Sequence, residues 1–190
     1  MELTNKQVLR SRLSDIRAKR TVAELALAAE SISNHDWKNI LPGQNIGCYA
    51  SLPTEPPTGL LRKELLSLGC AVYLPIITES NELLWGKDCE PFSTNRFGIT
   101  EPENGELSTG QISCVIIPAL AVDKFGNRLG RGAGYFDKAL STVASFAEGG
   151  PLRIAVVFDD EVLPEIPCEP HDQKIDLIVT PQRVISPVNI

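Results

Sequence analysis

Short apolar runs alternate with segments of helical periodicity along this chain of 190 residues. The run Val115-Ile116-Ile117 is continuous, which is typical of a strand that is covered on both faces of a parallel sheet. The alternation therefore predicts two strand–helix–strand units followed by one more strand. In chain order, the predicted elements are Ile46–Ser51, Thr58–Gly69, Ala71–Pro75, Cys114–Pro118, Tyr135–Phe146, Ile154–Phe158 and Asp176–Thr180.

The N-terminal segment and the middle of the chain follow other patterns. A first helix is predicted from about residue 5 into the thirties, because Leu9, Leu13 and Ile16 recur at helical spacing after Thr4, a suitable N-cap. Residues 79–112 are less regular and are expected to form excursions over the sheet. With 43% hydrophobic residues, the chain can bury one sizeable core. We expect an α/β fold, a three-layer sandwich with a mostly parallel, Rossmann-like sheet, in a single domain over residues 1–190.

Charge and hydropathy exclude several classes of protein. The net charge of −6 opposes a general nucleic-acid binder, which needs a basic surface to replace the counterions of phosphates. The longest apolar run, Cys114–Val122, contains Pro118 and is too short to cross a bilayer. The first 20 residues contain basic side chains but no apolar stretch like that of a signal peptide. We therefore expect a cytoplasmic protein, a monomer, without nucleic-acid or membrane partners.

The cysteines favour neither a disulfide framework nor a zinc site. They are odd in number, widely spaced and without a C-x-x-C pair, at Cys48, Cys70, Cys89, Cys114 and Cys168. We expect reduced, mostly buried thiols.

A cationic strip runs along the predicted first helix. At 100° per residue, Lys6, Arg10 and Arg17 fall within about 40° of one another, beside the apolar stripe. Helix geometry alone favours a solvated face for this strip. A binding role for a small anion is the alternative, because an acidic protein must gather its cations around one pocket.

The stretch from Arg128 to Asp137 is the most informative part of the sequence. Glycines at 130, 132 and 134 permit positive φ angles and leave no Cβ in the way, so that successive backbone N–H groups can converge on phosphate oxygens. Arg128 and Arg131 add charge-assisted donors, and Asp137 can hold a magnesium ion that bridges phosphates. The stretch predicts a nucleoside triphosphate site, against the alternative of a turn in which glycine merely avoids strain.

Two familiar phosphate-binding loops are excluded by spacing. A Walker loop ends in Gly-Lys-Ser/Thr, which does not occur here, and a Rossmann fingerprint needs a third glycine where this chain has Tyr135. A nicotinamide-dependent oxidoreductase nevertheless stays open as a rival, because Asp159 and Asp160 follow a predicted strand where a ribose-binding acid can lie. A folate or nucleotide carrier without turnover is a second rival.

The sequence resembles the 5-formyltetrahydrofolate cyclo-ligase family over nearly its whole length. The most specific match runs from Pro118 through the Asp-x-x-Gly-x-Arg-Leu-Gly-x-Gly-x-Gly pattern to Asp137. Further matches, in order, are Lys6-x-x-x-Arg10, Tyr49-x-Ser51-x-x-x-Glu55-x-x-Thr58, Phe97-Gly98-Ile99-x-Glu101-Pro102 and His171-Asp172-x-x-Ile175-Asp176-x-Ile178-Val179-Thr180.

The resemblance implies a reaction and a set of site residues. Members of the family convert 5-formyltetrahydrofolate to 5,10-methenyltetrahydrofolate while ATP is split to ADP and phosphate in the presence of Mg²⁺. Catalysis would involve Arg128, Arg131 and Tyr135, and magnesium would bind Asp137 and Asp176. ATP would contact Lys6, Gln7, Val8, Leu9, Arg10, Arg128, Leu129, Gly130, Arg131, Gly132, Ala133, Gly134, Tyr135 and Phe136. The folate substrate would contact Ala50, Glu55, Phe97, Arg131, Gly132, Ala133, Gly134 and Tyr135.

Two departures from the family pattern and two histidines complete the prediction. Many members carry Lys at the position of Ala133 and Tyr at that of Phe136, so this chain lacks one phosphate cation and one hydroxyl. The prediction therefore relies on backbone donors and on the two arginines of the turn. Neither His35 nor His171 is expected to take part in catalysis.

Overall fold

A seven-stranded sheet forms the centre of the described part of the molecule. The structure is a computed structural model, and it describes residues 5–80, 82–89, 91–95 and 98–188. The strand order is β12 (Val184–Ile185), β11 (Leu177–Val179), β9 (Leu152–Val156), β6 (Cys114–Pro118), β1 (Asn45–Gly47), β2 (Ala71–Ile77) and β3 (Leu83–Lys87). The strands from β11 to β2 are parallel, whereas both edge pairs are antiparallel. Two predicted roles, for Thr4 as a helix cap and for Phe97 as a folate contact, lie outside the described residues.

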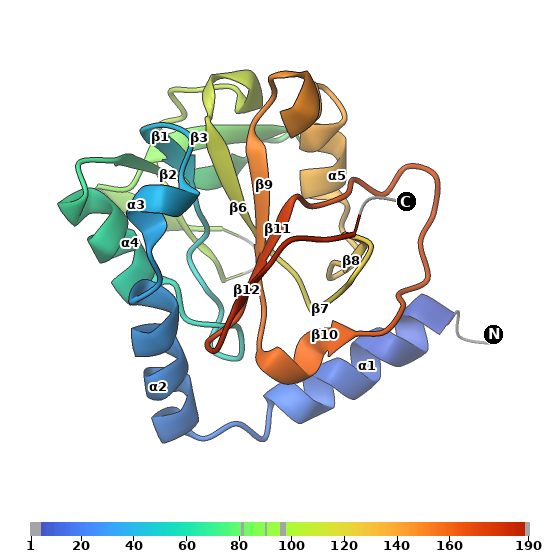
Figure 1. Ribbon diagram of the computed structural model, residues 1–190. Helices are drawn as coiled ribbons and strands as arrows, with labels where there is room; N and C mark the ends of the chain where they lie inside the picture. Colours follow the sequence, from blue (N-terminus) through green and yellow to red (C-terminus); the bar gives the residue numbers. More distant parts are fainter. Residues whose placement is uncertain (1–4, 81, 90, 96–97, 189–190) are drawn as a thin grey trace.

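Both faces of the sheet are covered by helices (Figure 1). In β6, Cys114 and Ile116 join one apolar cluster, which also contains Leu61 of α4 (Gly59–Ser67). Val115 joins a second cluster on the other face, which contains Leu140 of α5 (Tyr135–Leu140). Successive side chains of a strand point to opposite faces, so the continuous apolar run serves both layers. The predicted α/β sandwich with a mostly parallel sheet is confirmed.

The predicted first helix is two helices, α1 (Asn5–Arg17) and α2 (Val22–Ser33). The single-helix prediction was wrong because Thr21 and Glu24 form a capping box that starts a new helix: the Glu24 N–H donates to the Thr21 hydroxyl, and the Thr21 N–H donates to the Glu24 carboxylate. α2 then packs against α4, and the short α3 (Trp37–Ile40) leads into β1.

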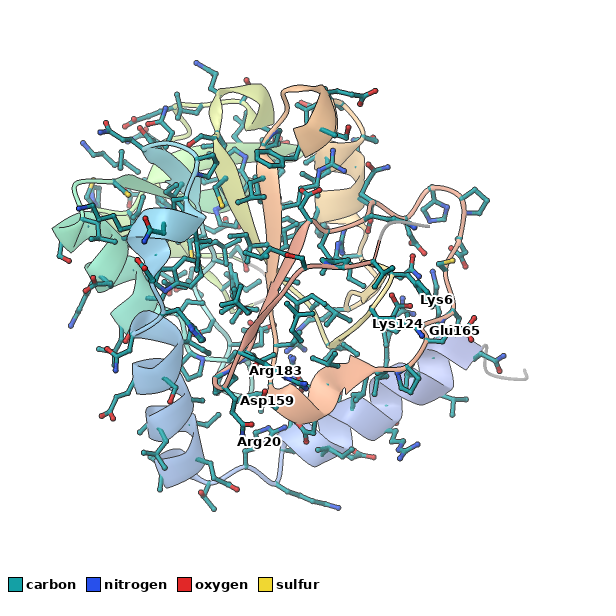
Figure 2. The ribbon with its side chains drawn as sticks, in the orientation of Figure 1. Lys6, Arg20, Lys124, Asp159, Glu165 and Arg183 are labelled. Carbon is teal, nitrogen blue, oxygen red and sulfur yellow. The ribbon has the colours of Figure 1, made fainter. Side chains whose placement is uncertain are left out.

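α1 packs against a small separate sheet of β10 (Val162–Leu163), β7 (Ala121–Asp123) and β8 (Arg128–Leu129). Leu13 shares an apolar cluster with Leu129 of β8. At the end of α1, the buried Arg17 donates to the Glu161 carboxylate at 2.7 Å and to the Ala119 carbonyl at 2.6 Å. These bonds fix α1 to the segments that follow β9 and β6. Figure 2 shows Lys6 and Arg20 at opposite ends of this helix.

Three further sequence predictions need correction. α5 ends at Leu140 instead of Phe146, because the Ser141 and Thr142 hydroxyls donate to carbonyls of the preceding turn and compete with continued helix. The region 79–112 contributes β3 to the main sheet, and it also contains a hairpin of β4 (Phe92–Thr94) and β5 (Thr100–Pro102). β11 is followed by a further strand, β12.

The cysteines and the helices bear on two other predictions. All five thiols are free, as expected, but only Cys48 and Cys114 are buried, whereas Cys89 and Cys168 are exposed. Within the described residues, no helix is both long and apolar enough to span a membrane.

Candidate active site

A cleft of about 550 Å³ opens at the carboxyl ends of β1, β2 and β6. β1 and β6 are neighbours in the sheet, but the chain continues from β1 towards one edge and from β6 towards the other. In open α/β sheets, such a reversal of strand order leaves a crevice in which ligands bind. Ala50, after β1, and Pro118, at the end of β6, accordingly line the cleft.

A β-hairpin precedes the glycine turn and fixes its position. The fully buried Asp123 accepts hydrogen bonds from the N–H groups of Phe125, Asn127 and Ile166, at 2.9–3.0 Å. Gly126 adopts a φ of +80° in the same hairpin, where an added Cβ would lie 2.7 Å from a carbonyl oxygen. Residues 123–127 are thus structural, and the cleft is bordered by the stretch that follows them, residues 128–137.

The middle of this stretch is open to the cleft. Residues 131–134 are exposed and line it, together with Gly130 and Tyr135. Gly132 and Gly134 have φ angles of +106° and +71°, which only glycine adopts without strain, whereas Gly130 is not in this region. The positive φ angles predicted at 132 and 134 are therefore present, and the one at 130 is not.

The cationic strip of α1 divides between two sites. Lys6 and Arg10 line the cleft, and Arg10 Nε donates to the Gly130 carbonyl at 2.8 Å, which fixes α1 to the glycine turn. Arg17 instead forms a buried ion pair with Glu161, outside the cleft. Gln7, Val8 and Leu9, which were predicted to contact the nucleotide, do not line the cleft.

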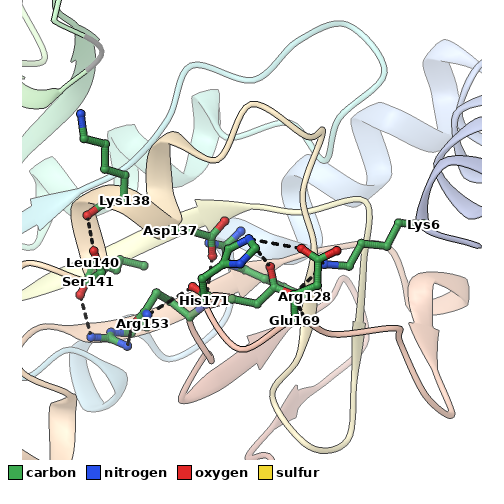
Figure 3. A network of polar contacts seen from close by, with 11 residues as sticks. Lys6, Arg128, Asp137, Lys138, Leu140, Ser141, Arg153, Glu169 and His171 are labelled. Atoms are coloured by element: carbon green, nitrogen blue, oxygen red, sulfur yellow. Dashed lines mark hydrogen bonds and ion pairs between the residues drawn. The ribbon is translucent and has the colours of Figure 1, made fainter. Parts of the chain in front are cut away.

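Lys6 binds an acidic loop that the site prediction did not include. Its Nζ lies 2.7 Å from an Asp172 carboxylate oxygen and 3.5 Å from one of Glu169 (Figure 3). Burial opposes ionisation of Asp172, but hydrogen bonds from Lys6 and from the Glu169 N–H outweigh it and hold its pKa below the usual value. His171 also lines the cleft. His171 and Asp172 belong to a matched motif, yet no local pattern shows that their loop folds back onto α1.

Arg128 and Asp137 form an ion pair inside the cleft. Arg128 Nη2 donates to Asp137 Oδ1 at 2.6 Å, and the Gln173 N–H donates to the same oxygen at 2.9 Å. Within the described residues, Asp137 Oδ2 accepts no hydrogen bond, and Arg128 Nε is buried without a partner. Asp176, the other predicted magnesium ligand, does not line the cleft. Its carboxylate accepts from the Arg153 N–H at 2.8 Å, and burial raises its pKa.

A second carboxylate, that of Glu55, lies beside the glycine turn. It is 5% exposed and lines the cleft at the loop after β1. Its Oε2 accepts the Leu52 N–H at 2.9 Å, and its Oε1 lies 2.8 Å from Arg131 Nε. Arg131 therefore connects Glu55, which was predicted to contact the folate, with the glycine turn.

The remaining wall of the cleft is apolar, apart from one carboxylate. Ile77 of β2, Leu83 of β3 and Ile99 line it beside Glu101 of β5. None of these was predicted as a site residue. Leu83, Ile99 and Glu101 were missed because the pattern of residues 79–112 did not show that this segment returns to the sheet.

Neither acid of the oxidoreductase rival lines the cleft. Asp159 accepts the Thr180 hydroxyl at 2.6 Å, and Asp160 pairs with Arg20.

Known proteins resemble the whole chain. The sequence profile of the 5-formyltetrahydrofolate cyclo-ligase family matches residues 2–181. A 5-formyltetrahydrofolate cyclo-ligase of Mycolicibacterium smegmatis is 36% identical, over 97% of this chain and 98% of that protein. The mouse protein of the same name is 28% identical, over 90% and 89%. The NMR structure of Aquifex aeolicus 5,10-methenyltetrahydrofolate synthetase shares the fold, with a TM-score of 0.80 at 24% identity, over 96% and 93%. The resemblance read from the motifs is confirmed, and the chain is an enzyme of the 5-formyltetrahydrofolate cyclo-ligase family.

Proposed function

We propose that this enzyme converts 5-formyltetrahydrofolate to 5,10-methenyltetrahydrofolate and splits ATP to ADP and phosphate in a Mg²⁺-dependent reaction. The observation that carries the proposal is that the glycine turn, Lys6, Arg10 and Glu55 all line one cleft. A site for both a triphosphate and a reduced pterin needs this combination of backbone donors, cations and a carboxylate. The cytoplasmic location and the monomeric state stay predictions.

The chemistry explains why the cleft needs both ligands at once. A formamide oxygen is a poor leaving group, so transfer of the γ-phosphoryl group to it creates an iminophosphate. The folate N10 then attacks the formyl carbon, and phosphate leaves. The main tasks of the protein are to position the two reactants and to neutralise the charge that moves between them.

The phosphate groups are assigned to one side of the cleft and the pterin to the other. The exposed backbone at 131–134, with Arg128 and Arg131, suits the phosphate oxygens. Glu55, a carboxylate that keeps its position through the Leu52 N–H, suits the N–H groups of a pterin ring. Tyr135 also lines the cleft.

Asp137 fits a magnesium site better than Asp176 does. Mg²⁺ in phosphoryl-transfer sites binds one or two carboxylates plus phosphate oxygens and water, and it supplies charge neutralisation on the transferred phosphoryl group. Asp137 lines the cleft and keeps one carboxylate oxygen without a hydrogen bond from the described residues. For Asp176 to bind the same ion, its carboxylate would have to turn from the Arg153 N–H.

The test is an absorbance assay for the methenyl product with purified protein, 5-formyltetrahydrofolate and Mg-ATP. We expect product and equimolar ADP with Mg-ATP, and neither when ATP or magnesium is omitted. Binding of both ligands without turnover would indicate a carrier. Saturation by NADH or NADPH with no response to ATP would favour the oxidoreductase rival.

A further inference from the structure

Five carboxylates line the cleft, and only one of them lacks a cationic partner among the described residues. The paired ones are Glu55 with Arg131, Asp137 with Arg128, and Asp172 and Glu169 with Lys6. The exception is Glu101, which accepts hydrogen bonds only from neutral donors in the described part of the chain. Its isolation is notable because a carboxylate in a protein interior is normally paired.

The position of Glu101 is fixed through one oxygen only. The residue is 6% exposed, and Oε1 accepts hydrogen bonds from Asn95 Nδ2 at 2.6 Å and from the Ile77 N–H at 3.2 Å. Oε2 accepts no hydrogen bond from the described residues, and it is not fully buried. Because Glu101 also lines the cleft, Oε2 is the oxygen available to a bound ligand.

The wall around this oxygen suits an aromatic amine. Ile77, Leu83 and Ile99 border the same part of the cleft and offer it no competing donor side chain. If the pterin lies against Glu55 and the formyl group faces the glycine turn, the aminobenzoyl portion, with N10, extends to the apolar wall.

The proposed reaction must release one proton from N10, which is a secondary amine in the substrate. When N10 attacks the formyl carbon, the new N10–C bond forms and the electron pair of the C=N5 bond returns to N5. N10 must then lose its proton before phosphate departs with the C–O electron pair and the amidinium of the product forms. The proton ends on the released phosphate, so that atoms and charges balance.

We propose that Glu101 is the general base that accepts the N10 proton through Oε2. This inference rests on the proposed function, since only the cyclisation step needs such a base. Within the described residues no cation pairs with this oxygen, and the two hydrogen bonds to Oε1 hold the carboxylate in place. The four paired carboxylates are less suitable because each already faces a positive charge.

The discriminating variant is Glu101→Gln, which keeps an oxygen for Asn95 and Ile77 but replaces the free oxygen by an amide nitrogen. We expect kcat to fall by roughly a hundredfold or more, with KM for both substrates and the melting temperature nearly unchanged. In a single turnover measured by rapid quench, ADP should appear at the wild-type rate while the methenyl product lags. Phosphorylation precedes proton removal, so only the second step is slowed.

The control is Glu103→Gln, an exposed carboxylate two residues further along the chain, which should behave as wild type. Wild-type kinetics in Glu101→Gln would overturn the inference. So would a rise in KM for the folate alone, which would indicate a binding role, or equal slowing of ADP and product with a lower melting temperature, which would indicate a structural role. If the wild-type enzyme itself makes no methenyl product from Mg-ATP, the proposed function fails instead.

Discussion

Replacing Asp137 by Asn tests the phosphate side of the cleft with the smallest change in shape. The Arg128 and Asp137 side chains are 4% and 18% exposed, so that water screens their 2.6 Å contact only in part. A hydrogen bond between charged groups contributes about 1.5–3 kcal/mol, and a neutral one about 1. Asn retains an acceptor for the Gln173 N–H. We therefore expect a loss of about 1–2 kcal/mol in the free energy of unfolding.

The substitution should also slow catalysis, because it removes the carboxylate assigned to magnesium. We expect kcat/KM to fall at least about tenfold, which is about 1.4 kcal/mol of transition-state stabilisation. The magnesium concentration for half-maximal rate should rise, as a titration of the methenyl assay would show. Arg128→Ala should lose a similar factor, and Asp15→Asn, at an exposed position of α1, is the matched control. A normal magnesium requirement and near wild-type kcat/KM in both active-site variants would refute the assignment.

Three other substitutions test separate parts of the cleft. Glu55→Gln should raise the Kd for the folate about tenfold and leave that for ATP unchanged, which separate titrations would show; equal weakening of both would mean misfolding. Gly132→Ala should lower stability by about 1–3 kcal/mol, because φ is +106° there, whereas Gly130→Ala should be tolerated; equal melting temperatures would contradict this. Lys6→Met should lower stability at neutral pH. The deficit should shrink below about pH 4, because a carboxyl with a lowered pKa, such as Asp172, stabilises only while ionised; a pH-independent deficit would exclude this pair as its cause.

The sequence predicted the layers of the fold well and the ends of its elements poorly. Continuous apolar runs such as Val115–Ile117 report burial on both faces, which depends only on neighbouring residues. The break between α1 and α2 depends on the Thr21–Glu24 box, a local signal that the helical periodicity concealed. β3 and β12 could not be read in the same way, because an edge strand is defined by its partner in space.

The cleft contains the predicted residues where one contiguous motif supplies them, and it differs from the prediction where distant segments meet. The glycine turn is both a sequence motif and a structural unit, so residues 128–137 line the cleft as a set. Gln7 to Leu9 were included only because they lie between Lys6 and Arg10, and helical geometry turns them away from the cleft. Glu101 and Glu169 reach the cleft through a hairpin and a long loop whose courses no local pattern specifies.

The pairing of charges explains how an acidic protein can present a site for a polyanion. Lys6, Arg128 and Arg131 each face a carboxylate, so their cations do not repel one another before a ligand binds. Arg10 differs, since within the described residues its one hydrogen bond goes to the Gly130 carbonyl, and no carboxylate offsets its charge. A triphosphate that enters the cleft must compete with carboxylates for the three paired cations. It needs to displace no described carboxylate to reach the Arg10 guanidinium. The attraction is therefore local, and it depends on α1 being held against the glycine turn rather than on the net charge of −6.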